Sequence, residues 1–333
     1  MAHIDKNNIL EILGKKIMPG QGAMINLNMA KLYTTTSVEV PVIIERSLKP
    51  GPVVLITAGI HGDELNGVEI VRQIISKKIN KPVKGTIICI PIVNVFGFLN
   101  LARAFPDGRD LNRVFPGTKN GSLASRFAYQ FVHKILPVAD FCLDYHTGGA
   151  SRFNVAQLRV VKGDQKSLKF AEIFNAPFTI YSKTISKSYR ETCQKLGKMV
   201  LLFEGGKSMD SNKDIAKHGV DGAMRILSHL GMLKPRFLLP EITVKSIIIE
   251  NSSWMRAKYS GLLHIKITCG NHVEKGEYIA TITDPYGKFR HKVTASHSGH
   301  IINVNESPIV YQGDAIFHLS IAPIPLNEEQ AQN

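Results

Sequence analysis

The chain has 333 residues, 44% of them hydrophobic, which is enough apolar material for a substantial core and excludes a disordered or collagen-like protein. Lys and Arg number 41 against 27 Asp and Glu, a formal charge of +14, but the basic residues are scattered and form no nucleic-acid-binding module. We therefore expect no nucleic-acid partner, and the length favours two domains.

The N-terminal residues 1–16 lack the charged and then apolar pattern of a signal peptide. No apolar run approaches the roughly 20 residues that span a bilayer, so we expect a cytoplasmic protein without a membrane partner. Four widely spaced cysteines show no Cys-x-x-Cys pairing and are interpreted as reduced core residues: Cys89, Cys142, Cys193 and Cys269.

From residue 38 onward, strand-like and helix-like segments alternate along the chain. Apolar strands are expected at 38–47, 52–59, 86–94, 139–146 and 199–206, and amphipathic helices at 63–78, 122–136, 167–175, 190–197 and 214–231. Buried strands separated by such helices predict a mixed, mainly parallel sheet flanked by helices. We assign this α/β domain to residues 1–235, with 1–37 as an N-terminal extension.

After Pro240 the pattern changes to short β segments with Gly, Asn and Asp at the turns. This predicts an all-β domain over 236–326, followed by a tail at 327–333. Residues 255–284 and 293–320 form a weak internal repeat, and two such halves resemble the biotinyl/lipoyl-like barrel-sandwich fold. An exposed edge of this domain would leave room for a homo-oligomer.

That resemblance raises a carrier function, because carrier domains present a modified lysine on the hairpin between the halves. Lys288 occupies a comparable place, but Gly287 and Phe289 flank it and the Met-Lys-Met surround of biotin carriers is missing. An ordinary hairpin lysine is therefore the favoured interpretation.

Three of the expected strands end in polar residues that are suited to a catalytic centre. The first runs into the segment IHGDE, where His61 and Glu64 come three residues apart at a helix start. Both are zinc ligands by chemistry, although a glutamate that caps the helix beside an exposed histidine would give the same pattern.

The second strand ends at His146, before a flexible Thr-Gly-Gly turn. Two histidines and one carboxylate leave a fourth zinc position open, as catalytic zinc requires. Asp144 lies two residues earlier on the same strand side and would either orient the His146 ring or form a structural salt bridge.

The third strand ends at Glu204, before paired glycines. A carboxylate beside a metal site is the expected general base, and a salt-bridged glutamate at a strand end is the alternative. A Pro/Gly-rich loop over 102–117 adds Arg103, Arg109, Asn112 and Arg113, which favour a carboxylate-bearing substrate unless they are ordinary surface residues.

The ordered motifs GIHGDE, DLNRVFPG, DYHTGG and FEGG resemble the succinylglutamate desuccinylase/aspartoacylase family, a branch of the zinc-carboxypeptidase-like hydrolases. The resemblance implies that one zinc ion per chain is bound by His61, Glu64 and His146, and that Glu204 is the base or proton shuttle. It further implies substrate binding by Asn112 and Arg113, a transition-state arginine at Arg103 or else Arg109, and a further substrate contact at Arg190.

The activity implied is hydrolysis of the amide bond of a small N-acyl amino acid or related N-acyl amine. The C-terminal domain, which is also similar to that of the family, would restrict access by larger substrates. A carboxypeptidase that acts on peptides, and a non-catalytic or carrier protein, are the alternatives. The motifs leave the acyl group and the amine open, because pocket contacts discriminate one or two methylenes.

Overall fold

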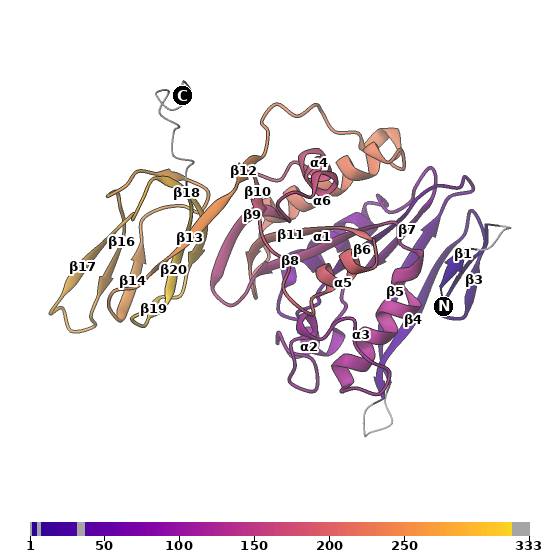
Figure 1. The fold of residues 1–333 in the computed structure, drawn as a ribbon, viewed down its shortest axis with the longest axis horizontal. Helices are drawn as coiled ribbons and strands as arrows, with labels where there is room; N and C mark the ends of the chain where they lie inside the picture. Colours follow the sequence, from indigo (N-terminus) through magenta and orange to yellow (C-terminus); the bar gives the residue numbers. More distant parts are fainter. Residues whose placement is uncertain (1, 5–7, 32–36, 322–333) are drawn as a thin grey trace, which may run out of the picture.

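The computed structural model describes residues 2–4, 8–31 and 37–321, and it consists of an α/β body joined to a β domain. Figure 1 shows the two parts side by side, with the β domain against the edge of the body formed by β9 and β10. The predicted tail at 327–333 lies outside the described residues. No helix in the described part of the chain is long and apolar enough to cross a membrane.

The body is built on one twisted sheet, in which the strands of the middle run parallel. In spatial order these are β11 (Met199–Lys207), β8 (Phe141–Gly148), β6 (Val53–Ala58) and β7 (Thr86–Ile90). Antiparallel strands extend both sides, with β9 (Arg152–Val160) beside β11, and β5 (Ser37–Arg46) and β4 (Gly22–Lys31) beyond β7. The prediction of a mixed, mainly parallel sheet is confirmed for this central part.

Helices cover both faces of the sheet because the central strands are apolar on both faces. Alternate residues of β6 point to opposite cores, so that Val53 and Leu55 pack in one core and Val54 and Ile56 in the other. The first core is closed by α3 (Leu123–Lys134) and α5 (Tyr189–Lys195), and the second by α1 (Leu65–Ser76), α4 (Gln165–Phe174) and α6 (Lys213–His229). All five predicted helices are therefore present.

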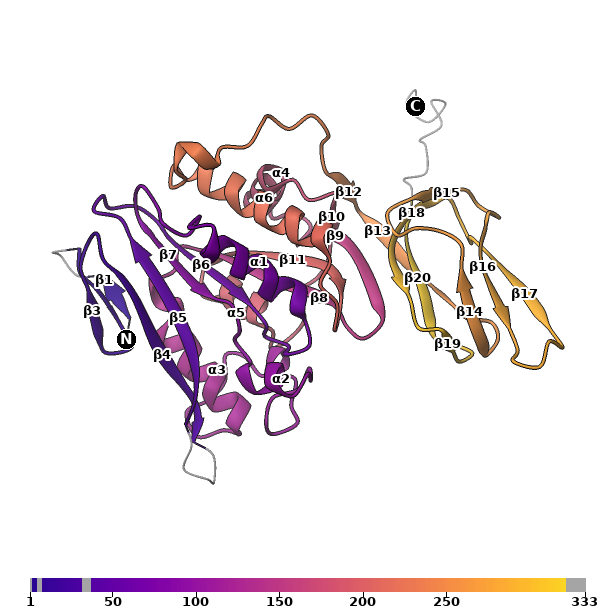
Figure 2. The same cartoon turned by 180° about the vertical axis from the view of Figure 1, so that it is seen from behind.

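Several strands were not predicted from the sequence. Residues 1–37 do more than extend the domain: β4 joins the main sheet, and β1 (His3–Ile4), β2 (Leu10–Ile12) and β3 (Lys15–Ile17) form a small sheet of their own. Figure 2 shows this small sheet beside β4 and β5, at the end of the body far from the β domain. Two further strands, β9 and β10 (Phe178–Tyr181), were missed, since β9 interrupts its apolar positions with polar side chains.

An irregular segment over 238–246 leads to β12 (Ile247–Ile249), which pairs with β10 of the body, and the β domain follows β12. Its strands are β13 (Asn251–Arg256), β14 (Gly261–Ile265), β15 (His272–Val273), β16 (Tyr278–Thr283), β17 (Arg290–Thr294), β18 (Gly299–Asn305), β19 (Ile309–Val310) and β20 (Ala315–Ile321). Matching Ser-Gly pairs of the two repeat halves lead into β14 and β18. A core of apolar side chains from both halves fills the domain.

Hydrogen bonds join the two parts into one continuous sheet. Strand β18 of the β domain pairs antiparallel with β9 of the body, with Asn303 opposite Asn154. The main sheet thus runs from β13 through β20, β18 and β9 to β11 and onward to β4. This pairing holds the β domain at the carboxyl end of β11, where the predicted site residues lie.

Candidate metal centre and active site

His61 and Glu64 lie in the turn between β6 and α1, at the carboxyl edge of the sheet. The turn is tight, because a Cβ atom on Gly62 would lie only 1.9 Å from the backbone carbon of Gly97. Glu64 is the residue before α1, but its carboxylate makes no capping hydrogen bond to the helix. His61 is buried rather than exposed. The alternative of a capping glutamate beside an exposed histidine is therefore wrong.

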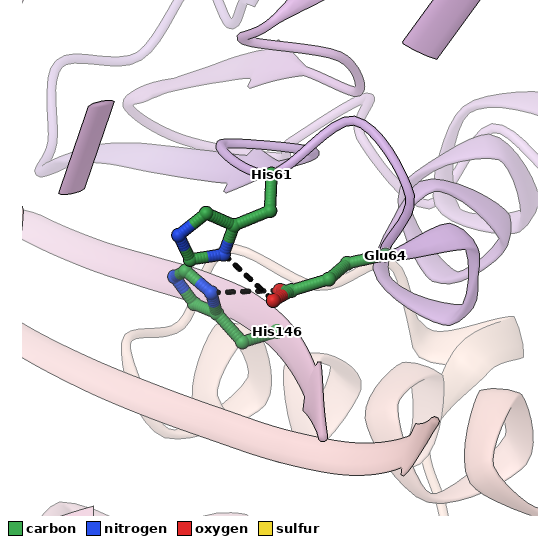
Figure 3. Close-up of side chains that lie close together, drawn as sticks. All are labelled: His61, Glu64 and His146. Carbon is green, nitrogen blue, oxygen red and sulfur yellow. Dashed lines mark hydrogen bonds and ion pairs between the residues drawn. The ribbon is translucent and has the colours of Figure 1, made fainter. Parts of the chain in front are cut away.

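His146 lies near the carboxyl end of the fully buried strand β8 and faces the same carboxylate. Its Nδ1 atom lies 2.9 Å from Oε2 of Glu64, and the Nδ1 atom of His61 lies 2.6 Å from Oε1 (Figure 3). Candidate ligand atoms of all three residues lie within 4.8 Å of one another. Both imidazoles thus turn the same ring nitrogen toward a single point.

The opposite nitrogens of the two rings are held by carboxylates. His146 Nε2 lies 2.9 Å from Asp144 Oδ2, and Asp144 Oδ1 accepts a 2.7 Å hydrogen bond from Thr57 Oγ1. His61 Nε2 lies 3.0 Å from Asp110 Oδ1. A carboxylate on Nε2 fixes the proton there and leaves the lone pair on Nδ1 for a metal ion. Of the two roles open for Asp144, the contact matches orientation of the His146 ring.

The donor set fits a divalent metal ion such as zinc. His61 Nδ1 is buried and lies 2.6 Å from Glu64 Oε1 without the geometry of a hydrogen bond, as expected of two ligand atoms that face one ion. Burial by itself would raise the pKa of Glu64, but the positive charge of protonated His61 and His146 holds it below its ordinary value, so that the residue is ionised. A bound metal ion would replace those protons as the positive partner of the carboxylate. Two neutral nitrogens and one carboxylate oxygen form a three-ligand set with room for a fourth ligand.

Of the two arginines considered for the transition state, Arg103 lies at this centre and Arg109 does not. Arg103 donates from Nη1 to Glu64 Oε1 at 3.0 Å and from Nη2 to Asp110 Oδ2 at 2.9 Å. Arg109 is 54% exposed and pairs with Asp107 at 3.2 Å. Among the described residues that line the cavity around the metal centre, Arg103 is present and Arg109 is not.

Asn112 and Arg113 follow Asp110 in a short 3₁₀ turn and line the same cavity. The Asn112 side-chain oxygen accepts from the Tyr189 backbone N–H at 2.8 Å, which anchors the turn on α5. Arg113 is half-exposed, with its nearest carboxylate oxygen, on Asp110, 4.0 Å away. Both residues lie where the resemblance requires them, and their binding role stays a prediction.

Arg190 also lines the cavity, but most of its guanidinium is engaged. It donates to the backbone oxygens of Arg159, Ser182 and Lys183 at 3.2, 2.8 and 2.9 Å. Burial, and then the nearby Arg159 cation, lower the pKa of Arg190 to about 10. In this arrangement Arg190 shapes the wall of the cavity through backbone contacts.

Glu204 lies on β11 opposite His146 of β8, so strand pairing brings it beside the metal centre. Asn154 Nδ2 donates to Glu204 Oε2 at 3.1 Å. Burial raises the pKa of Glu204 above its ordinary value, which is the direction expected for a proton-accepting group. No ion pair to Glu204 is recorded among the described residues, so the salt-bridge alternative finds no support here.

With the exception of Arg109, the predicted site residues line one cavity of about 870 Å³. The β domain contributes Trp254 and Asn303 to its lining, and Trp254 stacks on His318 with the ring centroids 4.5 Å apart. The body contributes Arg159, whose Nε atom is buried and has no hydrogen-bond partner among the residues that the structure describes. The cavity is therefore a shared product of both parts of the chain.

A model of the catalytic domain of succinylglutamate desuccinylase/aspartoacylase matches residues 50–230. The chain belongs to this family. The matched segment contains every metal-centre residue described above, from His61 to Glu204, and the family resemblance drawn from the four motifs is confirmed.

Relatives of this desuccinylase/aspartoacylase family member agree with the assignment. The chain described here is 28% identical over 246 residues to the N-α-acetyl-L-2,4-diaminobutyric acid deacetylase of Halomonas elongata, and the match covers 70% of this chain and 71% of that protein. The product-bound ectoine utilization protein EutE (DoeB) of Ruegeria pomeroyi is similar in structure, with a TM-score of 0.79 and 23% identity over 95% of this chain and 99% of that one. A family protein of Rhodobacter sphaeroides gives 0.76 and 23% over 90% and 96%. The two structural likenesses establish the fold.

Sequence reasoning missed five residues of this family member's site: Asp110, Asn154, Arg159, Trp254 and Asn303. Asp110 stands inside the quoted motif DLNR, and its place beside three cationic or amide side chains is the signal that could have marked it. The other four lie on β9 or in the β domain, where no local pattern reveals which residues face the cavity.

Proposed function

We propose that the chain is a zinc-dependent deacylase that hydrolyses the amide bond of a small N-acyl amino acid or related N-acyl amine. The observation that carries this proposal is the convergence of His61 Nδ1, His146 Nδ1 and the Glu64 carboxylate in a cavity that also contains Glu204. A bound zinc ion would polarise the amide carbonyl and make water a stronger nucleophile at neutral pH.

The chain's own residues supply the proton transfers. The Glu204 carboxylate accepts a proton from the water whose oxygen bonds to the carbonyl carbon. It then returns that proton to the amide nitrogen as the carbon–nitrogen bond breaks, which releases a carboxylate and an amine. Arg103 stabilises the negative charge that develops on the carbonyl oxygen, since its guanidinium lies against Glu64.

The charges of the cavity support a substrate that carries a carboxylate. Six cationic side chains line it: Arg103, Arg113, Arg152, Arg159, Lys183 and Arg190. Five carboxylates line it too: Asp63, Glu64, Asp110, Asp144 and Glu204. The side chains alone therefore leave a small excess of positive charge, which a bound divalent ion would increase. An excess of positive charge favours an anionic ligand and disfavours a substrate that would place an ammonium group near Arg159.

The size of the cavity supports a small substrate. Trp254 and Asn303 of the β domain close part of its boundary, and a volume of about 870 Å³ is in the range of small-molecule sites. The Halomonas relative is named for a small N-acetylated amino acid. A short acyl chain on an amino acid fits both observations.

The test is a screen of metal-free and zinc-loaded protein against N-acetyl and N-succinyl amino acids with acidic, neutral and basic side chains. Amine release is the readout, and the Glu204→Gln variant is the matched control. We expect zinc-dependent turnover that is fastest with acidic substrates. Cleavage of peptides without turnover of N-acyl amino acids would instead establish a carboxypeptidase, and a chain that binds no zinc and cleaves neither class would revive the carrier alternative.

A further inference from the structure

A chain of two buried amides connects the β domain to Glu204. Asn303 of β18 donates from Nδ2 to Asn154 Oδ1 at 2.7 Å, and Asn154 of β9 donates from Nδ2 to Glu204 Oε2 at 3.1 Å. The two asparagines are neighbours in the pairing between β18 and β9, so the same strand contact that joins the domains also places the amides.

The direction of these hydrogen bonds follows from the carboxylate. An ionised Glu204 can only accept, so Asn154 must present its NH₂ group to it. The Asn154 oxygen then faces β18, and Asn303 must answer with its own NH₂ group. Each amide thereby fixes the orientation of the next, in a series of donors that begins at Asn303 of the β domain and ends at Glu204.

If the two amides only held the strands β9 and β18 together, each of their polar atoms would be expected to have a hydrogen-bond partner. Asn154 and Asn303 are 5% and 2% exposed, in strand interiors where asparagine is a poor strand former and where burying an amide costs free energy. Within the described part of the chain Asn303 Oδ1 nevertheless has no hydrogen-bond partner, and Asn303 lines the active-site cavity. A purely structural interface would be better served by apolar side chains like the neighbouring Val155 and Val304.

The effect on Glu204 is geometric. The terminal torsion of a glutamate side chain is broad, so a carboxylate without a partner rotates freely. The hydrogen bond from Asn154 holds Oε2 and leaves Oε1 to exchange the proton. We propose that Asn154 and Asn303 are positioning residues that hold the Glu204 carboxylate in its reactive orientation, so that the β domain takes part in catalysis through Asn303. This inference rests on the role proposed above for Glu204.

The test uses the full chain and near-isosteric apolar variants: Asn154→Leu, Asn303→Leu and the double variant. Asn154→Leu and Asn303→Leu each leave a buried polar group without its partner and are expected to lose some stability. The double variant replaces both amides by apolar groups of similar size, so its loss of stability should be smaller than the sum of the two single losses. We expect Asn154→Leu to lower kcat about ten- to hundredfold with KM within about threefold, since a hydrogen bond to a charged group is lost. Asn303→Leu should lower kcat less, and the double variant should be no slower than Asn154→Leu.

The matched control is Asn305→Leu on the same strand, which removes the hydrogen bond from Asn305 Nδ2 to the Ala315 oxygen and the one that Asn305 Oδ1 accepts from the Ser307 backbone N–H, and which leaves the amide chain intact. Its kcat should equal that of the wild type, and zinc content should be the same in all variants. A kcat for Asn154→Leu within twofold of the wild type, or additive effects of the two substitutions, would overturn the proposal. So would a loss of stability without a loss of kcat.

A second readout separates this proposal from the proposed function. Chemical unfolding of the wild type, Asn154→Leu, Glu204→Gln and their combination gives the coupling between the two residues without any substrate. We expect the coupling to change the unfolding equilibrium constant by at least about threefold. Coupling without deacylase turnover would refute the proposed function alone, whereas turnover without coupling would refute the amide chain alone.

Discussion

Replacing Asp144 by Asn is expected to weaken zinc binding about tenfold, and replacing it by Ala about a hundredfold. Asp144 lies behind His146, with Oδ2 2.9 Å from the ring Nε2 atom. It is 1% exposed, and Thr57 Oγ1 donates to its other oxygen. Metal binding through Nδ1 needs the His146 proton on Nε2, and Asp144 is the group that keeps it there.

The two magnitudes follow from what each variant retains. Asn keeps an oxygen that accepts from Nε2–H and loses only the charge, whereas Ala removes the acceptor and leaves a buried N–H unpaired. Carboxylates behind metal-binding histidines are typically worth about 10- to 100-fold in metal affinity. Asp110 gives the comparison: it is 25% exposed and shares its charge with Arg103, so Asp110→Asn should cost only about threefold.

The assay is competition with a zinc chelator of known affinity, run on the wild type, both Asp144 variants and Asp110→Asn at one pH. Circular dichroism of the metal-free proteins establishes that the variants fold. Wild-type affinity for Asp144→Ala, or a larger loss for Asp110→Asn than for Asp144→Asn, would refute the assignment of Nδ1 as the ligand atom of His146.

Four further predictions concern the cavity. Glu204→Gln should lower kcat about a hundred- to ten-thousandfold while one zinc ion stays bound, and near-normal turnover would remove Glu204 from the base role. Arg103→Ala should lower kcat at least about a hundredfold and Arg109→Ala less than about twofold; the reverse order would make Arg109 the transition-state arginine. Arg159→Met should raise KM at least about tenfold for substrates with a second carboxylate and leave neutral ones unchanged, and equal effects on both would contradict a carboxylate contact. Removal of zinc should lower Tm, because zinc at 100 times its Kd stabilises the folded chain by about 2.7 kcal/mol, and an unchanged Tm would mean that the centre binds zinc weakly.

The metal centre was predictable because its residues stand at strand ends. His61, His146 and Glu204 each follow a run of apolar residues, and parallel strands bring such ends to one edge of a sheet. The helices of the body were predictable for a related reason, since α1 and α6 repeat their apolar positions with the period of a helix. Local pattern and global fold agree in these segments.

The rest depends on contacts between distant parts of the chain. The sequence around Asn303 does not indicate that β18 pairs with β9, because the two asparagines that come together are 149 residues apart in the chain. Arg103 and Arg109 are equivalent by composition, and only the path of the loop turns the first toward Glu64. The strand β9 was hidden because Arg152, Asn154 and Arg159, which line the cavity, interrupt the apolar alternation that would have revealed it.

The continuous sheet has a consequence for anyone who shortens this protein. Removing the β domain would expose the backbone donors and acceptors of β9 along the stretch that now pairs with β18. An unpaired strand edge can form hydrogen bonds with another chain, so the isolated body is expected to self-associate and not to stay monomeric. The boundary that the sequence shows near Pro240 therefore marks a change of architecture. Cutting the chain there would still break the pairing between β9 and β18, which belong to one sheet.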